Sequence, residues 1–327
     1  MTVHTEILLI AIAVSIACAI PGVFLVLRRM SMMADAITHT VFLGIVLAFF
    51  VTEDLNSPLL LVGATLVGVG TVWLTEMIHN TGLVNEDASI GIIFPLLFSI
   101  AIILVSLYSG NAHLDVDTAL LGEIAFAPFD RWMVNGTDLG PVSLWISLGV
   151  ALINLVLVML FYKELQLSTF DPLLAGLFGF MPAIIHYVLM TMVSLTVVAS
   201  FQAVGAILVI GLMIGPPVIA YLWTDSVKAM LISSIIIGII CAVIGTEAAF
   251  TLDVSIAGAI ATTIGLALLI AVIGTPKTGY IATYRRQRHL RRHYRETMML
   301  CHIYTHMNTP VAAIENGIGT IHEHLNW

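Results

Sequence analysis

Two ionisable side chains, Asp35 and His39, lie inside an apolar run over residues 34–51. They are four residues apart, so on a helix they share one face. Ionisable groups inside a membrane span are costly and by default mark a path or a site. A carboxylate with an imidazole suits Mn, Fe or Zn better than Cu(I), which prefers sulfur. The alternative is that Asp35 caps the helix and His39 hydrogen-bonds a neighbouring helix.

A second chemically distinctive segment covers residues 170–179. Asp171 can cap a helix, Pro172 suits a first helical turn and Gly179 can end the helix, so the segment predicts a short helix between two spans. Its remaining apolar anchors and small residues would form a contact surface: Phe170, Leu173, Ala175 and Gly176. Such a helix could insert into a partner ATPase on the cytoplasmic side. The alternative is an interfacial helix that lies on lipid.

A third segment, residues 197–217, contains many small residues that permit close helix contacts, together with Gln202. It could line a translocation path or a dimer seam, or serve helix packing alone. The apolar stretch 183–223 has almost no polar break, and Gly215-Pro216-Pro217 interrupts it. The stretch therefore predicts either two helices or one span followed by a broken helix, because proline removes a backbone donor and kinks a helix.

The elements that position these segments are apolar. The chain has 327 residues, of which 59% are hydrophobic and 10% charged, whereas soluble domains carry about 25% charged residues. Runs of this length can cross a hydrocarbon layer about 30 Å thick as helices. The sequence therefore predicts an all-α polytopic membrane protein with eight or nine transmembrane helices. The apolar runs are 5–27, 34–51, 58–78, 88–108, 142–162, 183–201, 203–223, 228–249 and 254–275.

The charges divide the chain into a transmembrane domain, residues 1–275, and a C-terminal tail, residues 276–327. The tail carries seven basic residues against three acidic ones, whereas the rest of the chain carries five basic and seventeen acidic residues. Basic residues collect on the cytoplasmic side of membrane proteins, so we expect the tail, Arg28, Arg29 and Lys163 to be cytoplasmic. Nine spans then place the N-terminus outside, whereas eight would place it inside.

Five segments together resemble one family. Residues 28–40 are similar to the signature segment of the zinc/manganese/iron ABC-importer permeases, and residues 170–179 are similar to the segment that couples those permeases to their ATPase. Further similarity lies in residues 86–92 and 121–123 and in His186-Tyr187 with the stretch 197–217. In order and spacing the resemblance covers residues 10–275. Three positions depart from the family pattern without removing an ionisable group: Ala34, Thr40 and Gly215-Pro216.

The resemblance implies the membrane subunit of a bacterial importer in the cytoplasmic membrane. Its partners would be cytoplasmic ABC ATPase subunits, a second permease subunit (a second copy or a related chain), membrane lipid and an extracytoplasmic metal-binding protein. Asp35 and His39 match the family positions that hold the ion within the membrane. The transported ion would be manganese, with zinc and iron left open, and no cofactor would be bound permanently.

The sequence contains no Gly-rich phosphate-binding segment with a Lys-Ser/Thr end, so we expect no ATP hydrolysis by this chain. The protein would be a permease rather than an enzyme. A competing hypothesis is an ion-coupled secondary metal transporter that acts without an ATPase, since such carriers also use broken helices and midplane sites. Nucleic-acid binding is not expected, because the basic run is short and lies next to a membrane span.

Several other ionisable residues have no assigned role from sequence. His186 matches a family position near the cytoplasmic face, and Glu247 is an acid inside the eighth apolar run. In the tail, histidines four residues apart could bind a metal on a helix face or lie in solvent. These are His289 with His293 and His302 with His306, followed by His322 and His324.

Overall fold

The computed structural model describes residues 2–53, 57–108, 124–134, 137–275 and 280–306. The chain divides into two compact units, Met1–Leu269 and Ile270–Trp327. The predicted boundary between spans and tail, at residues 275 and 276, falls close to this division.

Nine helices among the described residues are long and apolar enough to cross a membrane. This confirms the predicted all-α polytopic fold, with the larger of the two expected numbers of spans. The helices are α1 (Val3–Leu27), α2 (Ser31–Thr52), α3 (Leu59–His79), α4 (Glu86–Tyr108), α6 (Val142–Leu160), α9 (Pro182–Val204), α10 (Ala206–Trp223), α11 (Val227–Leu252) and α12 (Ile256–Gly274).

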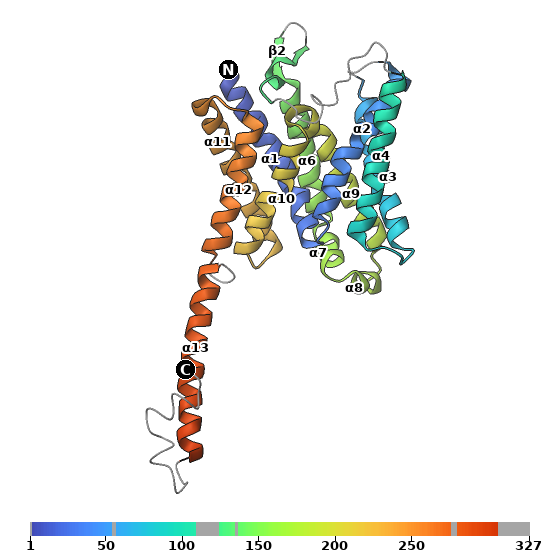
Figure 1. The fold of residues 1–327 in the computed structure, drawn as a ribbon. Coiled ribbons are helices and arrows are strands. Elements are labelled where there is room, and N and C mark those ends of the chain that lie inside the picture. The colour runs from blue at the N-terminus through green and yellow to red at the C-terminus, as the bar shows by residue number, and fades with distance from the viewer. Residues whose placement is uncertain (1, 54–56, 109–123, 135–136, 276–279, 307–327) are drawn as a thin grey trace. The chain divides into compact units, whose positions relative to one another are not determined.

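Short elements lie at the two ends of the larger unit. The N-terminus and an antiparallel hairpin lie at one end, and α7 and α8 lie at the opposite end (Figure 1). Arg28 and Lys163 belong to the α7 end, which is therefore the cytoplasmic one. The N-terminus is then outside, as nine spans require. The short elements are η1 (Ala127–Phe129), β1 (Arg131–Val134), β2 (Thr137–Pro141), α7 (Tyr162–Phe170) and α8 (Pro172–Leu177), and the tail contains α13 (Tyr280–His306).

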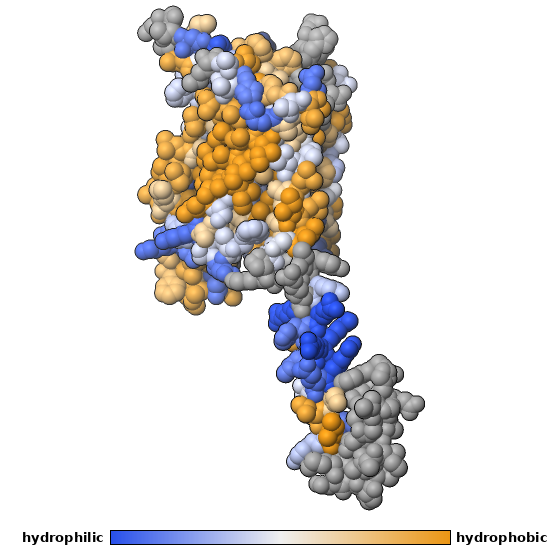
Figure 2. Space-filling model, turned by 90° about the vertical axis from the view of Figure 1, so that its left-hand side faces the viewer, coloured by the Kyte–Doolittle hydropathy of each residue, from blue (hydrophilic) through white to orange (hydrophobic). Residues whose placement is uncertain are grey.

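Burial within the unit differs strongly among the spans. In α1, 78% of the most apolar window is buried, whereas the share in α4 is only 17%. The core around α1 is apolar and includes Phe24, Ile37, Met190 and Leu208. On the face that Figure 2 shows, an apolar area lies between hydrophilic residues toward the two ends of the larger unit. Helix α1 is thus the central span, and α4 presents most of its surface outside this chain.

The stretch 183–223 folds as two helices that meet at Gly205. This glycine has φ 78°, a backbone conformation that other residues rarely adopt. A fold of two helices is the first of the two predicted alternatives. The second, a helix broken at Gly215-Pro216-Pro217, is wrong, because α10 continues through both prolines. Small residues of the stretch such as Ala203 are buried in the core, which supports the packing role, while Gln202 is exposed.

The prolines in α10 are accommodated by a close approach of α1. Pro217 has no N–H to donate to the carbonyl four residues earlier, so the Met213 oxygen loses its helical partner. An ideal Cβ on Gly22 would lie 2.0 Å from that oxygen, so a Cα hydrogen of Gly22 points at it. Cα–H donors form weak hydrogen bonds of this kind at helix–helix interfaces. The freed carbonyl is therefore covered by protein. Within a membrane, a backbone group that lacks its helical partner is tolerated only where it faces protein or a water-filled cavity.

Candidate functional site

The Asp35 and His39 side chains lie together on α2, as their spacing predicted. The His39 Nε2 atom is 3.5 Å from Asp35 Oδ1, and the two side chains are 30% and 36% exposed in this single chain. The imidazole stacks on Phe94 of α4 at 5.5 Å between ring centroids, and Phe98 lies edge-on at 5.9 Å. The aromatic rings of α4 thus pack against one side of the imidazole, and part of the His39 side chain remains exposed.

The spacing of these two donor atoms fits a shared metal ion. Metal–oxygen and metal–nitrogen bonds of about 2.1 Å at a tetrahedral angle place the two donors about 3.4 Å apart. The observed 3.5 Å between Oδ1 and Nε2 is therefore close to the spacing of a tetrahedral site, and an octahedral ion such as manganese would draw the two atoms closer together. Helix geometry alone gave the shared face, and the rotamers in the structure bring the atoms together.

Asp35 and His39 have no third metal-binding side chain of these types beside them in the part of the chain that the structure describes. No group of three or more His, Cys, Asp or Glu side chains suited to a metal occurs among the described residues. The two cysteines of the spans are buried elsewhere, and Cys18 Sγ lies 3.9 Å from Ser200 Oγ in the core. An ion at Asp35 and His39 would therefore need further ligands of another kind, such as water, or groups from another chain.

The predicted short helix after Asp171-Pro172 is present as α8. The Asp171 carboxylate accepts a hydrogen bond from the Leu174 backbone N–H at 2.9 Å, and Pro172 occupies the first turn. The helix is followed by Gly179, whose φ of 84° is left-handed. Local capping signals alone therefore account for both ends of α8.

Most of the expected contact residues of α8 are exposed. Leu173 is 84% exposed and Phe170 is 62% exposed, and a Cβ added to Gly176 would meet no atom within 4 Å. Ala175 differs from the expectation, because its side chain is fully buried and packs α8 onto the rest of the unit. The segment thus offers an apolar, open surface at the cytoplasmic end.

His186 belongs to a polar cluster at the same end. Its Nδ1 lies 3.2 Å from Arg28 Nη1, and a guanidinium only donates, so Nδ1 accepts and the ring proton is assigned to Nε2. Nε2 lies 2.7 Å from Glu76 Oε1, although the N–H does not point straight at that oxygen. One ring nitrogen thus accepts from Arg28 and the other lies beside the Glu76 carboxylate, which favours a structural role for His186 over metal binding.

Two further ionisable contacts at the outer end were not predicted from sequence. Glu6 is 4% exposed and pairs with Arg131 of the hairpin, whose Nε also lies 3.1 Å from Asp138 Oδ2. Glu247, unassigned from sequence, lies with its carboxylate 3.3 Å from His4 Nε2. The Glu6–Arg131 and His4–Glu247 contacts join residues distant in sequence, and the acid inside the eighth span thus contributes to the contact between α1 and α11.

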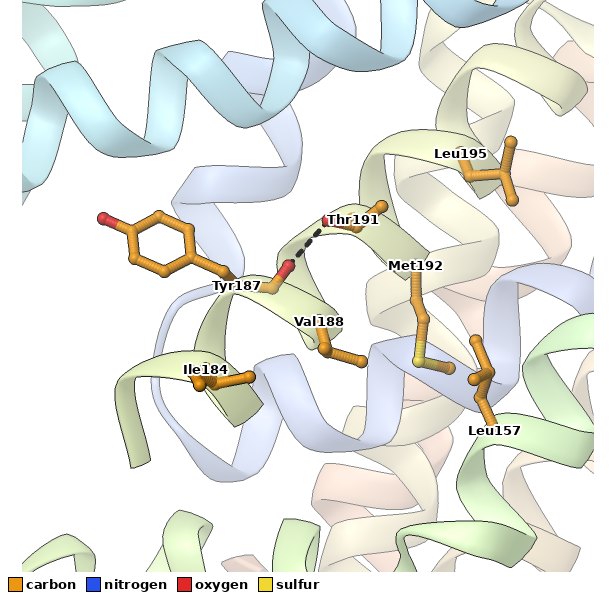
Figure 3. A pocket seen from close by; sticks show the side chains of 7 residues that line it. All are labelled: Leu157, Ile184, Tyr187, Val188, Thr191, Met192 and Leu195. Atoms are coloured by element: carbon orange, nitrogen blue, oxygen red, sulfur yellow. Dashed lines mark hydrogen bonds between the residues drawn. The ribbon is translucent and has the colours of Figure 1, made fainter. Parts of the chain in front are cut away.

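A groove of about 350 Å³ lies between α6 and α9. Its lining is almost wholly apolar, and the phenol oxygen of Tyr187 points away from the other lining side chains (Figure 3). The Thr191 hydroxyl donates to the Tyr187 carbonyl at 2.7 Å. The groove offers no ionised group for a cation, which separates it from the Asp35–His39 pair.

The tail histidines are only partly described. His289, His293, His302 and His306 belong to α13, so both pairs lie at helical spacing. The two remaining candidates, His322 and His324, lie outside the described residues. No cluster of three metal-binding side chains includes any tail histidine that the structure describes.

The fold and these sites define a multi-pass membrane permease. The model of the ABC 3 transport family matches residues 2–275, and the chain belongs to this family. It is a multi-pass protein of the bacterial inner membrane. The resemblance predicted from the five sequence segments is therefore confirmed.

Two curated relatives have equal identity to the chain. "Zinc transport system membrane protein TroD" of Treponema pallidum is 44% identical over 323 residues, which are 98% of this chain and 88% of that protein. "Manganese transport system membrane protein MntD" of Bacillus subtilis is 44% identical over 281 residues, which are 86% of this chain and 95% of that protein.

Among solved structures, PsaBC from Streptococcus pneumoniae in complex with Fab has the same fold. The TM-score is 0.72 at 28% sequence identity, and the match covers 87% of this chain and 96% of that chain. Family membership and this fold make the chain a permease subunit of an ABC importer, in which a separate ATPase hydrolyses ATP. The ion-coupled carrier that the sequence left open has no support in these matches.

Proposed function

We propose that this chain passes a divalent transition-metal ion, manganese in the first place, through the membrane by way of Asp35 and His39. The observation that carries the proposal is the 3.5 Å separation of their donor atoms on one membrane helix. Neutral imidazole and ionised carboxylate are the binding forms, so protons compete with the metal. Relatives named for zinc and for manganese are equally similar to the chain, which makes the choice of metal a property to measure.

The donor set favours manganese over thiolate-seeking ions. One oxygen and one nitrogen donor suit manganese, iron or zinc, whereas soft sulfur ligands select Cu(I). Because the described residues place no third His, Cys, Asp or Glu with this pair, we propose that a second permease subunit brings its own pair to the ion. This subunit is a second copy or a related chain.

The exposed surface of α8 is the proposed contact with the ABC ATPase. Leu173 and Phe170 would fill an apolar groove, and Gly176 would let that groove approach the backbone. At the opposite end, an extracytoplasmic metal-binding protein would deliver the ion. No permanently bound cofactor is required for this role.

The test is metal uptake into vesicles that contain the permease, its ATPase and its binding protein. We expect Asp35→Asn and His39→Ala to lower manganese uptake by at least about 100-fold, since even the outer-shell partners of a metal cause losses approaching this size. The control is Asp253→Asn, which removes the same charge from the turn between α11 and α12 at the outer end. Asp253 has a left-handed backbone conformation, and asparagine adopts this conformation readily.

Assembly with the ATPase is measured in the same preparations. Uptake at the control rate in both site variants would remove Asp35 and His39 from the path. Competition of manganese uptake by zinc and by iron in the wild-type vesicles then ranks the three metals. Stronger competition by zinc than by unlabelled manganese would overturn the choice of manganese.

A further inference from the structure

Arg28 occupies the junction between α1 and α2, where it caps the C-terminus of α1. Its side chain is partly buried, and this burial lowers the pKa of the guanidinium from its ordinary value. The chain turns sharply just after it, because Arg29 has φ 61°, and α2 begins at Ser31. A partly buried cation thus stands seven residues before Asp35.

The guanidinium of Arg28 contacts α7 with two of its three nitrogen positions. Nε donates to Thr169 Oγ1 at 3.2 Å, and Nη2 donates to Ser168 Oγ at 3.1 Å. Ser168 is 4% exposed, so this contact is shielded from water. Only Phe170 and Asp171 separate Thr169 from the first residue of α8.

The third nitrogen position of Arg28 leads to α9 and α3. Nη1 lies 3.2 Å from His186 Nδ1, and Nε2 of that ring lies 2.7 Å from Glu76 Oε1. The other oxygen of Glu76 accepts a hydrogen bond of 2.6 Å from the Tyr187 hydroxyl. The planar fork of one arginine therefore joins the end of α7 to a chain of polar groups in two spans.

We propose that Arg28 is a positioning residue that transmits the movement of α8 to the start of α2, and so to Asp35 and His39. The inference rests on the proposed role of α8 as the ATPase contact. A shift of α8 pulls on Ser168 and Thr169, and their shared donor belongs to the turn that begins α2. Lysine cannot replace this arginine, because a single ammonium does not reproduce the fork.

The experiment measures metal ions transported per ATP hydrolysed, in vesicles with the full permease, its ATPase and its binding protein. We expect Arg28→Gln and Arg28→Lys to lower this ratio by about tenfold, a usual size for coupling between two sites. ATP hydrolysis and ATPase assembly persist, because α8 itself is unchanged. The matched control is Arg29→Gln, which removes the adjacent, exposed basic residue and leaves the ratio unchanged.

A second variant, Ser168→Ala with Thr169→Val, removes the acceptors on α7 and keeps Arg28 with His186. This variant should lower the number of metal ions transported per ATP as the Arg28 variants do. It tests the proposal if the Arg28 variants do not fold. A merely structural role would lower thermal stability and leave the number of ions per ATP unchanged, which would overturn the proposal. If Leu173→Asp leaves ATPase assembly intact, the role of α8 is wrong, and this failure is separate from that of Arg28.

Discussion

Two arginines at opposite ends of the larger unit are held in different ways. Arg131, at the outer end, pairs with two carboxylates, those of Glu6 and Asp138. Arg28, at the inner end, donates to two hydroxyls and an imidazole, and its nearest carboxylate in this cluster, Glu76, lies beyond the His186 ring.

The difference indicates different tasks. A buried carboxylate cannot easily lose its only cation, so the Glu6–Arg131 pair fixes the hairpin to α1. Arg28 is only partly buried, so its guanidinium can replace a hydroxyl acceptor by water or by another neutral acceptor, and no buried carboxylate is left without a cation. The Glu6–Arg131 contact is thus suited to hold the hairpin in place. The contacts of Arg28 with α7 are suited to change during a movement of α7 and α8.

The largest expected effect on stability comes from Arg131→Leu. Glu6 would stay buried without its cation, and we expect a loss of about 3 kcal/mol, the low end for a broken buried pair because Arg131 is itself partly exposed. Thermal unfolding of the permease in detergent measures it. The double change Glu6→Leu with Arg131→Leu should recover most of the loss, and a double variant as unstable as the single one would contradict this account.

Leu173→Asp should act on assembly and leave the fold alone. The side chain is 84% exposed, so the melting temperature of the permease should not change. Binding of the ATPase should weaken by about 2 kcal/mol, as for an anchor residue at the centre of an interface. Co-purification with the ATPase measures the loss. Unchanged co-purification would show that the ATPase docks elsewhere.

A pair of glycine variants sharpens the contrast between the packed spans and the inner surface. Gly22→Ala forces a Cβ to within 2.0 Å of the Met213 oxygen, and we expect a cost of about 2 kcal/mol from overpacking. Gly176→Ala meets no atom and should gain at most about 1 kcal/mol of helix stability. Thermal unfolding compares the two, and equal effects would refute the close approach of α1 and α10.

The smallest effect is expected from removal of the tail. Truncation after residue 280 should keep manganese uptake within about twofold of the full chain, the range of substitutions remote from working parts. The family match ends at residue 275, and the predicted coupling surface lies before it. Uptake by the correctly inserted truncated protein is the measurement, and complete loss would make the tail part of the transport machinery.

The spans, α8 and the Asp35–His39 face were predictable because each depends on local signals. Apolar runs give the spans, Asp171-Pro172 gives a helix start, and a spacing of four residues gives a shared face. The apolar runs 183–201 and 203–223 placed a break close to Gly205, but the prolines left a second break open as an alternative, because proline is a strong local signal for one. In the structure, Gly22 of another helix closely approaches the Met213 carbonyl that Pro217 leaves without its helical partner.

The polar contacts at the two ends could not be predicted for the same reason. Glu6 and Arg131 are 125 residues apart, and Arg28 and His186 are 158 residues apart. Periodicity assigns residues to a face but does not pair faces over such distances. A signal was nevertheless present, since an acid such as Glu6 within a long apolar run requires a partner.

The central claim is that metal crosses this permease only when an ATPase drives it. The most direct measurement compares manganese uptake into vesicles that hold the permease and its binding protein, with and without the ATPase and ATP. We predict uptake only with both present, and none through Asp35→Asn under the same conditions. Uptake at the full rate without the ATPase would contradict the account and restore the ion-coupled carrier.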